Sequence, residues 1–232
     1  MMKRARVPLA ALAALLTTFT PALSDFAPSP GVFSRIVFES PFDSTIMSGL
    51  SYDNDRLYTA LISQIFAVNP DDTNDVVSLL NLPFNLTVSV VQRANDVIYA
   101  AWSSEFTLPI PFKFGIEEAN SFLTLLTVDS IHDSAVNPAG DIFLVAAPGG
   151  TDARIFRFVP ATTTLVQVIQ AAGAPGGIAF DRSGRLYYAS QASSRILRYT
   201  PAQLAAGSLL EADGEVVVAN VLAGFLAADD RD

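Results

Sequence analysis

The chain has 232 residues, half of them hydrophobic, with 23 acidic residues, 14 basic residues and no cysteine. Its net charge of −9 argues against nucleic acid as a partner, which needs a basic surface, and against an anionic membrane. Without cysteine, disulfides, thiolate catalysis and cysteine-ligated zinc are excluded, so a hydrophobic core must stabilise the fold.

The first 24 residues have the pattern of a secretory leader. A basic start, an apolar stretch and a small-residue cleavage motif follow one another at Lys3–Arg6, 7–16 and 22–24. The apolar stretch is too short to cross a bilayer as a helix, and an uncleaved N-terminal anchor is the alternative. We therefore expect a mature chain from about Asp25, secreted or periplasmic, with no membrane association after cleavage.

A phrase of strand, tight turn and strand recurs about every 44 residues. The best copy spans residues 176–190, with its turn between Asp181 and Gly184, and weaker copies lie at 135–145, 50–58 and 90–99. The aromatic residues that follow the four turns are Tyr58, Tyr99, Phe143 and Tyr187. An all-strand repeat of roughly 40–50 residues is typical of a β-propeller blade.

The predicted fold is therefore an all-β propeller with four-stranded antiparallel blades, in one domain over residues 25–232. The repeats are expected at about 45–83, 84–128, 129–170 and 171–222. Third strands are expected at 65–68, 112–114, 155–158 and 196–199, and outermost strands at 76–80, 122–128, 164–169 and 215–220.

Two segments interrupt this rhythm. Residues 201–207 begin with proline and end with glycine, which predicts one helical turn before the last strand. Residues 105–120 contain Pro109, Pro111 and Gly115, and predict a long loop or an extended hairpin. Asp181, at a tight turn, is expected to hydrogen-bond its own backbone rather than a metal.

Half-blades are expected at both ends of the chain. Residues 34–40 resemble a third strand, and residues 223–232 resemble the start of the 176–190 phrase. They could pair into one blade that closes a five-bladed ring. The pattern favours instead a truncated piece of a six-bladed propeller, in which open sheet edges would be an aggregation liability.

Residues 177–189 and 195–199 resemble the NHL repeat and the wider six-bladed group that includes senescence-marker and gluconolactonase-like proteins. The resemblance is good over about 130–207 and faint over 45–128. The NHL branch implies a binding platform without a catalytic set. The lactonase branch implies a glutamate, asparagines and an aspartate around one divalent metal in the central channel, and of that set only Asp133 has a plausible place here.

Candidate catalytic residues lie where the third repeat begins. His132, the single histidine, is a candidate general base or metal ligand, and Asp133 is a candidate catalytic residue and ligand for calcium or zinc. Neighbours on a strand point to opposite faces, so the two need a bend to share one ion. The alternative is a loop histidine that hydrogen-bonds a backbone carbonyl.

Candidate ligand-binding residues lie on the same loop face. Trp102, the single tryptophan, with Glu105 nearby, could stack on a sugar or aromatic ligand, and Gln191 belongs to this face. The alternative for Trp102 is packing between blades. The leading interpretation is an exported binding or scaffold protein of NHL-like type for a small molecule or protein. The alternatives are a divalent-metal-dependent lactonase-type hydrolase and a fragment without activity of its own.

Overall fold

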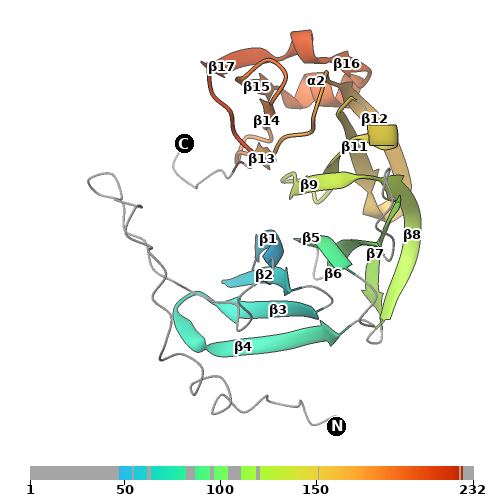
Figure 1. Cartoon of the computed structure of the whole chain (residues 1–232), viewed down its shortest axis with the longest axis vertical. Coiled ribbons are helices and arrows are strands. Elements are labelled where there is room, and N and C mark those ends of the chain that lie inside the picture. Colours follow the sequence, from blue (N-terminus) through green and yellow to red (C-terminus); the bar gives the residue numbers. More distant parts are fainter. Residues whose placement is uncertain are drawn as a thin grey trace.

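The computed structural model describes residues 47–53, 55–61, 64–81, 87–94, 97–103, 111–118, 121–150, 152–224 and 226. Within these ranges the regular structure is almost entirely β and forms four sheets, arranged in an arc (Figure 1). The predicted all-β class is confirmed. The predicted leader, residues 34–40 and Glu105 lie outside the described residues, as does most of 223–232.

Sheets 1 and 2 are antiparallel and follow the chain order. Sheet 1 contains β1 (Met47–Asp53), β2 (Arg56–Leu61), β3 (Gln64–Asn69) and β4 (Asp72–Asn81). Sheet 2 contains β5 (Thr87–Ala94), β6 (Val97–Ser103), β7 (Pro111–Glu118) and β8 (Ser121–Asp129). Of the predicted loop or hairpin at 105–120, residues 111–118 form β7, which pairs with β6 and β8, and the rest lies outside the described residues.

Sheets 3 and 4 repeat the same order. Sheet 3 contains β9 (Ile131–Val136), β10 (Ile142–Ala146), β11 (Arg154–Val159) and β12 (Thr164–Gln170), with β16 (Leu209–Leu210) added in parallel to β12. Sheet 4 contains β13 (Ile178–Phe180), β14 (Leu186–Ser190), β15 (Arg195–Tyr199) and β17 (Glu215–Ala219). The third and outermost strands predicted from sequence alternation coincide with these strands.

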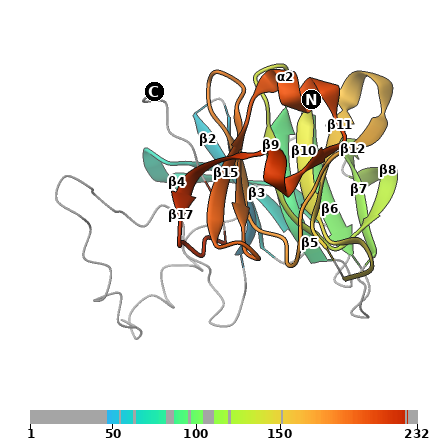
Figure 2. The ribbon, with the colours of Figure 1, turned by 90° about the horizontal axis from the view of Figure 1, so that it is seen from above.

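The first strand of each sheet lies toward the centre of the arc and the fourth at its rim (Figures 1 and 2). The inner strands contact one another in the order β1, β5, β9 and β13. This radial arrangement of antiparallel sheets is that of propeller blades.

Hydrophobic clusters between neighbouring sheets hold the arc together. Tyr58, Tyr99 and Phe143, the aromatic residues that follow the repeated turn, belong to the clusters between sheets 1 and 2, 2 and 3, and 3 and 4. Each is at most 5% exposed. The recurring aromatic is therefore the side chain by which one sheet packs on the next.

The repeated turns at 137–140 and 181–184 and the helical turn form as predicted. Gly140 and Gly184 adopt φ values of +85° and +75°, and their amides donate to the carbonyl oxygens of Asn137 and Asp181. The Asp181 carboxylate accepts the Arg185 amide, as expected for a turn aspartate. The helix α2 (Pro201–Ala206) begins at a Thr200–Gln203 capping box.

Extra residues, or β-bulges, recur at matching places in the sheets. On the inner strands the extra residues, which have no register partner on the neighbouring strand, are Gly49, Ser89 and His132. On the outermost strands the extra residues include Leu79, Leu125, Val168 and Val217. Bulges re-aim side chains and increase twist, so these positions are the ones where the blades depart from plain alternation. None of the described helices is long and apolar enough to cross a membrane.

Candidate functional site

Asp133 lies on the inner strand β9 and connects it to β13. Its Oδ2 accepts the Ile178 amide at 2.9 Å and its Oδ1 accepts the Ser134 amide at 2.8 Å. Burial raises the pKa of the carboxyl above its ordinary value, and the two amide bonds and the charge of His132 offset only part of this. Asp133 thus links sheet 3 to sheet 4 through its hydrogen bond to Ile178.

His132 occupies the bulge of β9, so the bend that sequence reasoning required is present. Its Nε2 lies 3.4 Å from the carbonyl oxygen of Gly224, after the last strand, whereas Asp133 reaches toward Ile178. His132 and Asp133 therefore contact different parts of the chain.

Within the described residues, Asp133 has no ligand set around it for a divalent cation. Over the described ranges no three His, Asp or Glu side chains are gathered as a metal site would need. Both oxygens of Asp133 accept backbone amide hydrogens.

Of the candidate ligand-binding residues, Trp102 and Gln191 lie among the described residues and Glu105 does not. Trp102 is 4% exposed and belongs to the cluster between sheets 1 and 2, which favours the packing alternative. Gln191 is half-buried, and its Nε2 donates to the carbonyl oxygen of Pro175 at 3.3 Å. On this face the loops are close-packed, because a Cβ on Gly173 would lie 3.0 Å from that of Ala192.

Sequence reasoning missed a polar cluster around Glu211. Its Oε1 accepts the Ser190 hydroxyl at 2.6 Å, and its Oε2 accepts the Ala172 amide at 3.0 Å. Burial raises the pKa of the Glu211 carboxyl, but hydrogen bonds from Ser190, Ser193 and Ala172, together with the charge of Arg195, outweigh it, and the pKa lies below its ordinary value. Glu211 thus connects the segment before β17 to Ala172, which follows β12, and to Ser190 at the end of β14.

Replacing Glu211 with glutamine is expected to lower the free energy of unfolding by about 1 kcal/mol at pH 7. A lowered carboxyl pKa stabilises the fold above the unfolded value, near pH 4.3, and this contribution is lost as the pH falls through the folded pKa. The difference between the two proteins should therefore shrink below about pH 4. Thermal melts from pH 3 to 7 measure this.

Glu215→Gln is the matched control for the Glu211 variant. Glu215 pairs with Arg198 on the surface, its side chain is 64% exposed, and such pairs contribute about 0.5 kcal/mol or less. A Glu211→Gln melt that follows the Glu215→Gln melt at every pH would contradict the role assigned to Glu211.

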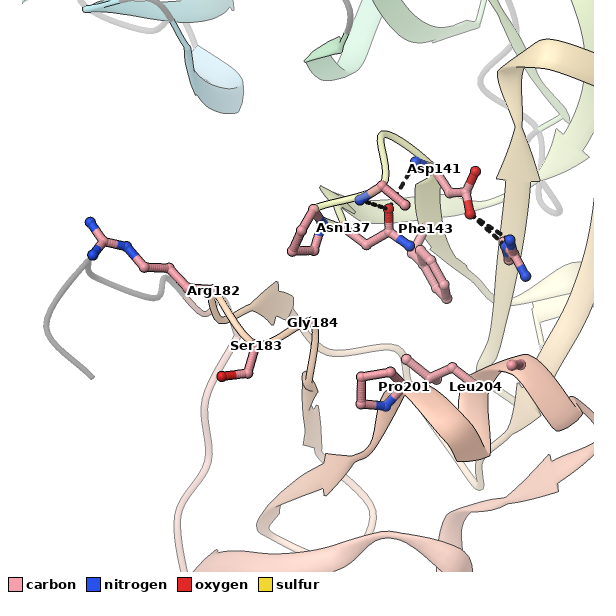
Figure 3. Close-up of a pocket in the computed structure, with 12 residues that line it drawn as sticks. Asn137, Asp141, Phe143, Arg182, Ser183, Gly184, Pro201 and Leu204 are labelled. Atoms are coloured by element: carbon pink, nitrogen blue, oxygen red, sulfur yellow. Dashed lines mark hydrogen bonds and ion pairs between the residues drawn. The ribbon is translucent and has the colours of Figure 1, made fainter.

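A hollow of about 270 Å³ lies on the opposite face, between the turns of sheets 3 and 4 and α2 (Figure 3). Phe143 and Leu204 line it, and Arg157 donates to the Asp141 carboxylate there through Nε at 2.8 Å. Figure 3 shows the Arg182 side chain extending away from the other labelled residues. The hollow is smaller than most ligand pockets, and no sequence pattern marked it.

No family model matches this sequence, and no curated protein matches it. Solved structures do match. A protein provisionally named a gluconolactonase is 16% identical with a TM-score of 0.53, over 77% of this chain and 66% of that one. Regucalcin, a calcium-binding protein from Agrobacterium tumefaciens, is 12% identical with a TM-score of 0.51, over 77% and 61%.

A protein from Bacteroides uniformis, provisionally named a 6-phosphogluconolactonase, is 14% identical with a TM-score of 0.50, over 78% of this chain and 56% of that one. The chain spans less than two thirds of the length of each of the three structures. At these identities the likeness concerns the fold alone. The chain shares its fold with six-bladed propeller proteins of the gluconolactonase and regucalcin group.

Proposed function

We propose that the chain is an exported hydrolase of the lactonase class. The observation that supports this is its fold likeness to gluconolactonase-named structures at TM-scores of 0.50 and 0.53. A second support is the bulge that places His132, the single histidine of the sequence, on an inner strand. In propellers of this kind the inner strands surround the channel where a substrate would enter.

In this proposal His132 is the general base. It takes a proton from the water whose oxygen bonds to the lactone carbonyl carbon. The ring C–O bond then breaks, and the leaving alkoxide takes up the proton that His132 received from the water. No step is assigned to a metal ion, because the described residues do not gather a ligand set for one.

Lactone hydrolysis by the full chain, secreted from an expression host with a new N-terminus near Asp25, tests the proposal. Sugar-acid lactones are supplied at fixed pH, with added calcium or zinc and then with EDTA. His132→Gln is expected to lower kcat/KM by about 10²–10⁴-fold, the usual contribution of a general base. Its melting temperature should stay within about 2 °C of the parent.

Asp152→Asn is the control for this assay. Asp152 is exposed on the same loop face, and its Oδ1 accepts the Gly173 amide at 2.9 Å. Its rate should match that of the parent chain. No lactone turnover by the parent under any condition would contradict the hydrolase. A rate abolished by EDTA would require metal ligands from outside the described residues.

A binding or scaffold protein is the second candidate. It is favoured by Asp133, whose two oxygens are both taken up by backbone amides in a structural role. This candidate predicts that a ligand raises the melting temperature with the logarithm of its concentration above Kd, while no product forms.

A further inference from the structure

The segment that follows β17 is anchored by a hydrogen bond that recurs in the blades. The Val221 amide donates to the carbonyl oxygen of Ser194, which directly precedes β15, at 2.9 Å. One sheet earlier, the Ala171 amide donates to the carbonyl oxygen of Ala153, which directly precedes β11, also at 2.9 Å. Because the bond occurs at equivalent places in sheets 3 and 4, the repeat sets the path of the chain after β17.

The anchored segment brings a backbone carbonyl to His132. The carbonyl oxygen of Gly224, which follows shortly after Val221, lies 3.4 Å from Nε2 of the ring, although 92 positions separate the two residues in sequence. His132 is half-buried at the bulge of β9, and a bulge re-aims the side chain that it carries. The ring is thus held by its own strand and by the segment after β17.

The chemistry of this contact decides which ring nitrogen carries a hydrogen. A carbonyl oxygen can only accept a hydrogen bond, so Nε2 of His132 must be the donor. A neutral imidazole has a single N–H, which leaves the lone pair on Nδ1. At 3.4 Å the bond is weak, but the two tautomers of a neutral histidine have similar free energies, so a weak bond is enough to select one.

We propose that the Gly224 carbonyl is a positioning group for His132, which holds the hydrogen on Nε2 and makes Nδ1 the atom that accepts a proton. Its catalytic meaning rests on the proposed function, in which His132 is the general base that takes a proton from water. Hydrogen bonding to a backbone carbonyl and action as a base were alternatives for this histidine in the sequence. In the structure the two roles fall to different nitrogens of one ring.

Alkylation of the full chain with iodoacetamide shows which nitrogen bears the lone pair. The sequence contains one histidine and no cysteine, so every alkylated histidine isolated after acid hydrolysis comes from His132. The ratio of the Nδ1 product to the Nε2 product should be at least about 5-fold higher for the folded chain than for the same chain in guanidinium chloride, since a typical net hydrogen bond gives a ratio of this size.

Val221→Pro and Val221→Ala separate the effect of the Gly224 carbonyl from general shielding of the ring. Proline has no amide hydrogen, so the anchor to Ser194 is lost, whereas alanine keeps it. The product ratio of Val221→Pro should fall to that of the unfolded chain, and the ratio of Val221→Ala should equal that of the parent. Melting temperatures within about 4 °C of each other show that both variants are folded. The comparison of the folded and unfolded parent holds whether or not the proline variant folds.

Equal product ratios for the folded and the unfolded parent would overturn the proposal. A folded ring that reacts at neither nitrogen would do the same, because Nδ1 would then be closed to water. A folded Val221→Pro variant with the ratio of the parent would overturn the role of the Gly224 carbonyl. A parent that reacts at Nδ1 but turns over no lactone would contradict the hydrolase and leave the position of the ring hydrogen established.

Discussion

Replacing Phe143 with alanine is expected to lower the free energy of unfolding by about 3–5 kcal/mol. Its ring is 1% exposed and packs edge-to-face on Phe180 with the ring centres 4.8 Å apart. It lies in the cluster that joins sheets 3 and 4, so the cavity would open between two blades. Urea unfolding, followed by circular dichroism, measures the change as a lower midpoint.

Val166→Ala is the control for the Phe143 variant. Val166 is 52% exposed on the rim strand β12, and its truncation should change the free energy of unfolding by about 0.5 kcal/mol or less. A loss below about 1 kcal/mol for Phe143→Ala would mean that the aromatic residue of the repeat does not couple neighbouring blades.

The parts of the fold that could be predicted are those encoded locally. Alternation over 155–158 is enough to place β11, because every second side chain of a strand faces the same way. Pro201 and Gly207 are enough to predict α2, because a first-turn proline and a terminal glycine act within one turn.

The bulges could not be predicted from the same patterns. The sequence pattern of an apolar run such as 216–218 is the same whether or not one of its residues is bulged, since the pairing partner decides the register. The placement of His132 on a bulge of β9 therefore emerged only from the structure.

Long-range contacts of the site were equally hidden. Glu211 binds the amide of Ala172 across 39 positions of sequence, and no motif links the two. Trp102 fits a stacking platform or a core position equally well in sequence, because either environment suits an aromatic residue at a strand end. In the structure Trp102 packs in one cluster with residues of β2 and β3, so it is a core residue.

Gly176→Ala is expected to lower the free energy of unfolding by about 3 kcal/mol, at the upper end for overpacking. A Cβ at this position would lie 1.9 Å from the carbonyl oxygen of Ala189. That oxygen belongs to the backbone of β14, which cannot move aside freely because the Ala189 amide donates to Gly177 at 2.9 Å. In Gly224→Ala the new Cβ would meet no atom within 4 Å, so this variant should unfold like the parent. Equal urea midpoints for the two variants would show that β14 moves aside for the added methyl group. The close approach of Gly176 to Ala189 would then not be the reason for a glycine at position 176.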